Sequence, residues 1–140
     1  MGWLVADFIT ENDVIIQDGV FAYNFKASGA IKKGQCVGIA PVMDNCVMAP
    51  NTADAGPLDC VGIATMDAAD KQWVAVAGPG NLCRALCAAA SPVGTALYGG
   101  IDGIFTATQG NATKVSAYVV ELPAKVKSTA TSYLGKVLLV

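Results

Sequence analysis

From residue 19 onward, apolar and polar positions alternate in short runs that end at glycine, proline, asparagine or aspartate. Phe21, Tyr23 and Phe25 alternate with small or polar neighbours, which is typical of a strand with one buried face. Short strands spaced roughly every eight to twelve residues favour a barrel or a sandwich. We therefore predict an all-β fold, a small compact β-barrel or β-tulip-like sandwich with an extended N-terminal arm. The expected strands are 21–25, 36–40, 46–49, 58–65, 72–77, 82–90, 95–98, 103–107, 114–122 and 134–140.

One of these segments, 82–90, fits two periods. Leu82, Cys83, Leu86 and Cys87 follow helical spacing, but a short run between a turn and a proline suits a strand equally well. Because the segments on both sides read as strands, a strand is predicted here too.

Turn signals indicate how several strands should pair. Segment 72–77 is expected to fold back on 58–65 as a hairpin, and 99–102 is expected to form another hairpin loop. Asp44-Asn45 marks a turn between two strands, and Pro123 should close the strand at 114–122.

A turn followed by a strand occurs twice, at residues 29–40 and 90–98. Gly34 supplies the positive φ that such a turn needs, and Gly94 occupies the same place in the second segment. The sequence Cys-Val-Gly-Ile-Ala also occurs at 36–40 and again at 60–64. These matches suggest similar turn-and-strand pieces, although they are too short to prove a duplication.

Residues 1–18 lack both the helical and the strand period, so we divide the chain into an N-terminal arm (1–18) and a single β-rich domain (19–140). Such a segment is either an arm that docks on a partner or a first strand that covers the open end of a barrel. The sequence leaves both interpretations open. If it is an arm, its binding residues are the apolar and aromatic ones: Trp3, Leu4, Val5, Phe8 and Ile9.

The composition points to self-association. Hydrophobic residues make up 54% of the chain and charged residues only 14%, against roughly 25% in an ordinary soluble domain. So little charge leaves neutral surface that another protein usually covers. With a net charge of −2 and no basic cluster beyond Lys32-Lys33, nucleic-acid binding is not expected. The start of the chain, interrupted by Asp7, is too short to span a membrane.

Catalytic and metal chemistry find little support. The chain has no histidine, which excludes Ser-His-Asp and Cys-His arrangements, and Asp67 and Asp70 fit solvated turn positions. The five cysteines have no regular spacing and are interpreted as buried thiols. We expect neither an enzyme nor a bound metal or cofactor.

An alternative is a small-ligand or carrier-type domain, of the β-clip or the biotinyl/lipoyl kind. The turn at residues 31–35 suggests it, but the hairpin 42–45 has no lysine to carry a group.

An ordered series of motifs resembles the small capsid decoration (cement) proteins of tailed phages. The motifs are A-I-K-K-G-Q-C-V, D-C-V-G-I-A-T, Q-W-V-A-V-A-G, P-V-G-T-A-L-Y and Y-L-G-K-V-L-L-V, and the resemblance covers residues 19–140. Such proteins are similar in role to the head decoration protein of lambdoid phages. The chain departs from them in its five cysteines and in a long polar loop at 124–133.

The resemblance implies a virion structural protein, made in the host cytoplasm and placed on the outer capsid surface. It implies a homotrimer whose partner is the major capsid protein and whose N-terminal arm orders on contact with that partner. Trp3, Leu4, Val5, Phe8 and Ile9 are the capsid-binding residues expected on this basis.

Overall fold

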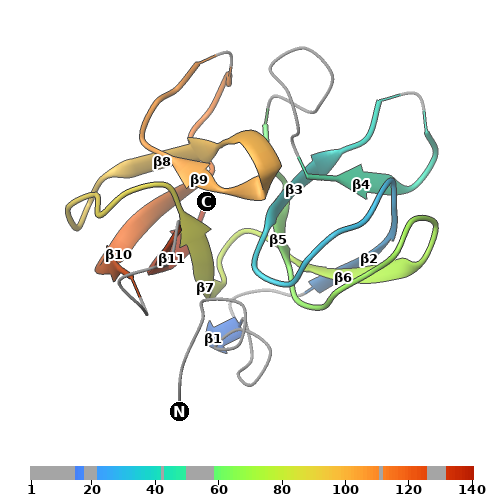
Figure 1. The fold of residues 1–140 in the computed structure, drawn as a ribbon, viewed down its shortest axis with the longest axis horizontal. Helices are drawn as coiled ribbons and strands as arrows, with labels where there is room; N and C mark the ends of the chain where they lie inside the picture. The colour runs from blue at the N-terminus through green and yellow to red at the C-terminus, as the bar shows by residue number, and fades with distance from the viewer. Residues whose placement is uncertain (1–14, 18–21, 42, 50–58, 111, 126–131) are drawn as a thin grey trace.

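A computed structural model of the chain describes residues 15–17, 22–41, 43–49, 59–110, 112–125 and 132–140. These parts contain eleven strands and one 3-10 turn, η1 (Ile101–Gly103). The predicted all-β fold is confirmed, and so is the barrel, which occurs twice (Figure 1).

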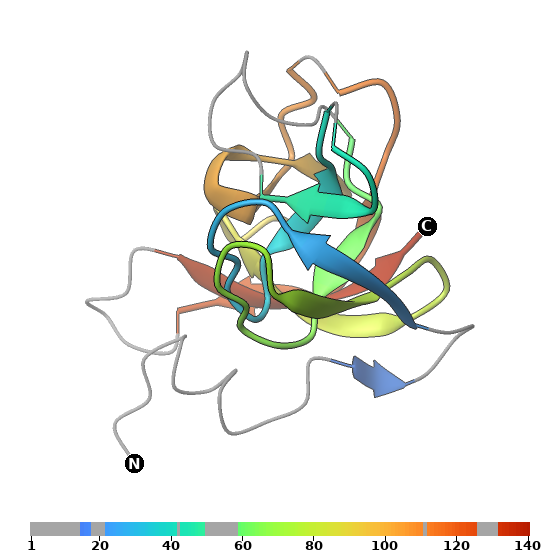
Figure 2. The same ribbon diagram turned by 90° about the vertical axis from the view of Figure 1, so that its right-hand side faces the viewer.

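Five strands close the first barrel, here called the N-barrel, in the order β2-β4-β3-β5-β6. Strands β2 and β4 run parallel, and the other neighbours run antiparallel. Figure 2 shows this barrel nearest the viewer. Its strands are β2 (Ala22–Ala27), β3 (Cys36–Ile39), β4 (Cys46–Met48), β5 (Gly62–Ala64) and β6 (Trp73–Ala77).

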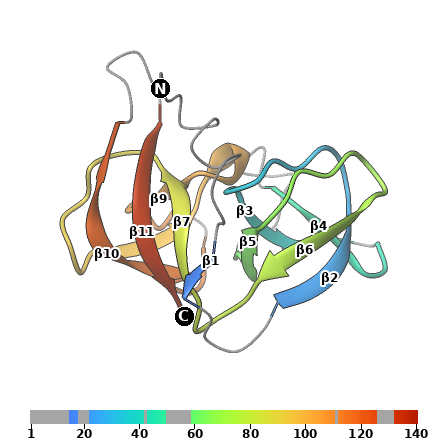
Figure 3. The ribbon, with the colours of Figure 1, turned by 90° about the horizontal axis from the view of Figure 1, so that it is seen from below.

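The next five strands form a second barrel, the C-barrel, in the order β7-β11-β10-β8-β9, closed by the pairing of β9 with β7. Strand β1 (Ile15–Gln17) pairs with β7, at one side of the C-barrel (Figure 3). The strands of the C-barrel are β7 (Leu82–Cys87), β8 (Ala96–Gly99), β9 (Phe105–Thr106), β10 (Ala117–Ala124) and β11 (Tyr133–Leu139).

The two barrels have the same topology. Each pairing in the N-barrel has a counterpart of the same direction in the C-barrel when β2 to β6 are matched, in order, with β7 to β11. The parallel pair β2–β4 corresponds to the parallel pair β7–β9, for example. The chain is therefore a structural duplication of a five-stranded barrel.

Single residues correspond as well. The Gly34 amide donates to the Ala64 carbonyl at 2.9 Å, and the Gly94 amide donates to the Val119 carbonyl at 2.8 Å. Gly34 and Gly94 have φ of 91° and 89°, as the turn pattern predicts. A Cβ on Gly94 would meet nothing within 4 Å, so the backbone angle rather than lack of space calls for glycine there.

The two sequence repeats have different origins. The turn-and-strand segments at 29–40 and 90–98 occupy matching places in the two barrels and belong to the duplication. The two copies of Cys-Val-Gly-Ile-Ala both lie in the N-barrel, where Cys36 of β3 pairs with Ile63 of β5. This sequence match therefore comes from two neighbouring strands of one barrel and not from the duplication of the barrel.

Most predicted strands and hairpins are confirmed. Strand β6 pairs with β5, β9 pairs with β8 across η1, and the ambiguous segment is strand β7, in which every second residue is buried. The prediction for Pro123 was wrong, because β10 continues to Ala124. Pro123 falls within a shift of register between β10 and β11, where a missing amide donor is tolerated.

Buried side chains form two clusters. The first fills the N-barrel with residues such as Val37, Val47 and Val76. The second fills the C-barrel around Phe105 and Leu97, and it also contains four residues from the outer surface of the N-barrel: Cys36, Cys60, Ile63 and Ala77. These four residues join the two barrels.

Candidate binding surfaces

The predicted capsid-binding residues Trp3, Leu4, Val5, Phe8 and Ile9 lie outside the described residues. The described part of the predicted arm is strand β1, which pairs Ile15 with Cys83 and Gln17 with Leu82 of β7. Residues near the end of the predicted arm therefore meet the C-barrel.

Large apolar side chains are exposed on both barrels. Those at least 39% exposed are Tyr23, Ile39, Met43, Met66, Trp73, Val93, Ile101, Tyr118, Val120, Leu122, Leu138 and Val140. Several of them gather on two surfaces, which we define below.

The first surface, here called the C-face, lies on the outside of β8, β10 and β11. Tyr118 is paired with Ala96 on one side and with Leu138 on the other, so the three residues stand in one row across the sheet. Tyr118 is 40% exposed and Leu138 is 39% exposed. Val115, which is half-buried, precedes β10 and completes the surface. These four residues of the C-face are mainly apolar.

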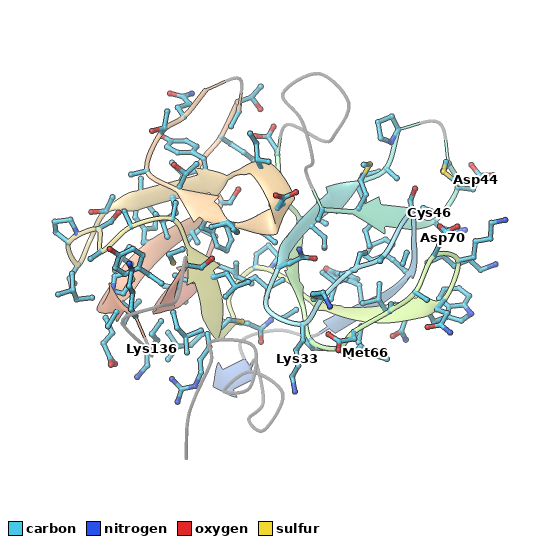
Figure 4. All side chains as sticks on the ribbon, viewed as in Figure 1. Lys33, Asp44, Cys46, Met66, Asp70 and Lys136 are labelled. Carbon is cyan, nitrogen blue, oxygen red and sulfur yellow. The ribbon has the colours of Figure 1, made fainter. Side chains whose placement is uncertain are left out.

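The second surface, the N-end, lies on the N-barrel. It comprises Lys26, Ile39, Met43 and Trp73, which are all exposed. Lys26 and Trp73 are cross-strand neighbours, and the Lys26 Nζ atom lies 5.5 Å from the centroid of the Trp73 ring. Figure 4 shows Asp44, the neighbour of Met43, on the side away from the C-barrel.

A groove of about 270 Å³ opens beside β2 and the ends of β3 and β5. Two aromatic rings, Tyr23 and Phe25, contribute to its wall with centroids 6.2 Å apart, and Lys114 brings the one charged side chain among its lining residues. The rest of the lining is Ile39, Cys60, Val61, Pro79 and Val140.

All five cysteines are buried free thiols, as predicted. A hydrogen bond with the Cys60 thiol, together with burial, raises the pKa of Cys36. Burial raises the pKa of Cys87 to about 12. Because only a thiolate is strongly nucleophilic, these two cysteines are inert at neutral pH. Among the described residues, no three His, Cys, Asp or Glu side chains are grouped so that they could hold a metal ion.

Three aspartates fasten loops by accepting backbone hydrogen bonds. Asp70 accepts from the Gly29 amide and Asp67 from the Lys33 amide, each at 2.8 Å. Their predicted place in turns is confirmed. Asp59 receives hydrogen bonds from the residues at 113 and 114, and so ties the start of β5 to the loop before β10.

The hairpin compared with carrier domains connects β3 to β4. Its described tip, residues 43–45, contains no lysine, and Asn45 has a φ of 57°. Asparagine tolerates this left-handed conformation better than most residues. The tip is therefore an ordinary tight turn.

No model of a known protein family matches the chain, and no curated protein matches it either. The resemblance to phage decoration proteins thus stays a prediction from the motifs. In the described parts of the chain, no helix has the length and apolar character needed to cross a membrane.

Proposed function

We propose that this protein is a capsid decoration (cement) protein, which binds the outside of an expanded viral capsid and stabilises contacts between subunits of the major capsid protein. The observation that carries the proposal is the exposed apolar surface of a closely packed β body. The C-face and the N-end offer exposed apolar side chains on the two barrels. A protein that bridges neighbours in a lattice needs two such surfaces.

The mechanism is thermodynamic linkage. A protein that binds only the assembled, expanded shell stabilises that shell by its free energy of binding. Many copies on a symmetric lattice multiply the effect, so each contact can be weak. No chemical step is required of the decoration protein itself.

The N-terminal arm supplies the capsid contact in this proposal. Trp3 and Phe8 are aromatic, and aromatic residues dominate many interfaces once water is removed from them. Asp7 and Glu11 select the binding register against basic groups on the capsid, and so contribute to specificity more than to affinity.

The test is co-sedimentation of the full chain with expanded capsids that lack decoration. Replacing Trp3 and Phe8 together by alanine should weaken binding at least tenfold, or about 1.4 kcal/mol. Thr10→Ala is the matched control, because it changes a polar residue of the same segment. Binding that is equal for both variants would remove the arm from the proposal, and no binding of the wild type would remove the function.

The groove favours one further candidate, the binding of a small apolar anion. Its aromatic wall and Lys114 suit such a ligand, although its volume is just below the usual range of roughly 300–1,000 Å³. The probe is anilinonaphthalene sulfonate, a fluorescent apolar anion. We expect saturable binding at one site that Lys114→Ala weakens about tenfold and the control Lys125→Ala does not. Equal binding by the two variants would exclude the groove.

A further inference from the structure

The duplication allows each surface of one barrel to be compared with its counterpart on the other. In the N-barrel, Ile63 pairs with Cys36 on one side and with Ala77 on the other. In the C-barrel, Tyr118 pairs in the same way with Ala96 and with Leu138. The C-face therefore corresponds, residue by residue, to the four N-barrel residues that join the barrels, with Val115 in the place of Cys60.

The corresponding surfaces differ in burial. Ile63 and Ala77 are fully buried because the C-barrel covers them. Their counterparts Tyr118 and Leu138 are 40% and 39% exposed, although both carry large, mainly apolar side chains. The same face of the barrel is thus covered in one copy of the repeat and uncovered in the other.

The surface that covers the N-barrel comes from a different part of the C-barrel. The Leu86 amide of β7 donates to the Gly34 carbonyl at 3.4 Å, and the Gln35 side-chain amide donates to the Asp102 carbonyl at 2.8 Å. Gly99 packs so closely on Cys60 that a Cβ at Gly99 would collide with the Cys60 sulfur. The junction is therefore heterologous, since each barrel contributes a different face.

The counterpart of this covering surface is the N-end. Gly99 pairs with Phe105 as Ile39 pairs with Val47, so Ile39 takes the place of Gly99. Lys26 takes the place of Leu86, because the two residues hold the same position in the pairing of β2 with β6 and of β7 with β11. In Figures 1 and 3, β5 and β7 lie where the two barrels meet, whereas β10 lies at one outer side of the molecule and β2 at the other.

We propose that the C-face of one copy packs on the N-end of the next copy and repeats between chains the junction that joins the barrels within a chain. The occupant of both surfaces is thus a second copy of this protein. A Cβ at Gly99 would already collide with the Cys60 sulfur, so the larger side chains of Ile39 and Val115 must keep the two chains farther apart at this point than the two barrels are within a chain. A heterologous contact closes into a ring if the rotation per copy permits, and three copies would give a ring of six barrels.

This inference goes beyond the proposed function, because the contact between copies is independent of any capsid. It is tested first by light scattering. We expect the wild type to be oligomeric at micromolar concentration and Tyr118→Lys to be monomeric. Ile101→Lys is the matched control, since Ile101 is also exposed but lies on neither surface, and it should leave the mass unchanged. A monomeric wild type would overturn the inference.

Cysteine cross-linking tests the geometry even if Tyr118→Lys unfolds. Val115 and Ile39 are the counterparts of Cys60 and Gly99, which touch in the internal junction. Chains with Val115→Cys are mixed with chains with Ile39→Cys and oxidised by copper phenanthroline and oxygen, which takes up the two electrons and two protons of the thiols. A disulfide dimer should form only in the mixture, and not when Ile101→Cys replaces Ile39→Cys. Dimers in either single variant would indicate an isologous contact and contradict the proposal.

Discussion

At the scale of single residues, three aspartates hold described loops by accepting backbone hydrogen bonds. The described side chains include one ion pair, between Lys136 and Glu121 with 3.0 Å between nitrogen and oxygen, and the Glu121 side chain is mostly exposed. An exposed pair of this kind contributes little to stability. Asp59 makes a stronger connection, because its carboxylate accepts from the Thr113 amide at 2.9 Å, from the Lys114 amide at 3.2 Å and from the Thr113 hydroxyl.

The Asp59 connection predicts a pH-dependent stability. Partial burial opposes ionisation of Asp59, but the hydrogen bonds from Thr113 and Lys114 outweigh it and lower the pKa of the carboxyl group. A lowered pKa means that the stabilisation is present above the pKa of the unfolded chain, near 3.9, and is lost as the pH falls through the folded value. We expect Asp59→Asn to reduce the free energy of unfolding by about 1 kcal/mol at pH 7, after allowance for solvent screening.

Urea unfolding of Asp59→Asn and wild type between pH 2 and 7 measures this effect. Asp102→Asn serves as the control, because it removes one negative charge but none of these three hydrogen bonds. The difference between wild type and Asp59→Asn should shrink in acid. A difference that is constant with pH would show that the charge of Asp59 plays no part.

At the scale of elements, β1 is the one strand outside the duplication among the strands that the structure describes. It pairs with the first residues of β7, with a bulge between its two paired positions. A short strand with two pairings adds little by itself, but it covers an edge that would otherwise be open to other chains. Because β1 begins at Ile15, the predicted arm can be removed up to residue 14 without the loss of any described strand.

Two truncations separate the arm from β1. Removing residues 1–14 should leave the melting temperature within about 2 °C of wild type, because β1 is kept. Removing residues 1–18 should leave a folded body that melts several degrees lower, since roughly 1 kcal/mol corresponds to about 4 °C for a chain of this size. Circular-dichroism melts give both values. If the shorter deletion is already destabilised, residues before β1 belong to the folded body, as the alternative of a covering strand requires.

At the scale of the whole molecule, the low charge of the chain has a structural counterpart. One apolar face of the barrel is used internally to join the two barrels, and the corresponding face is left exposed. An uncovered apolar face on a repeated unit favours further association of the same kind. The proposed ring of copies would bury the C-face and leave the arm to meet the capsid.

The sequence by itself determined the class of fold and the places of most strands and turns, because these follow from local sterics and from alternation. Gly34 and Gly94 show their left-handed turns directly, and even the ambiguous segment at 82–90 could be assigned from its neighbours. The candidate binding surfaces were harder to predict from the sequence. The arm residues were identified by composition alone, and the C-face was missed, although Tyr118 alternates with Ala117 and Val119 in the predicted strand 114–122.

Tertiary structure alone decided that the strands close two barrels rather than one, and that these barrels are copies of each other. Strand pairing joins residues far apart in the sequence, and corresponding positions such as Ile63 and Tyr118 share only their apolar character. Alternation tells which residues share a face of a strand. It does not tell which of the two faces a second barrel will cover, because that depends on the packing of the folded units.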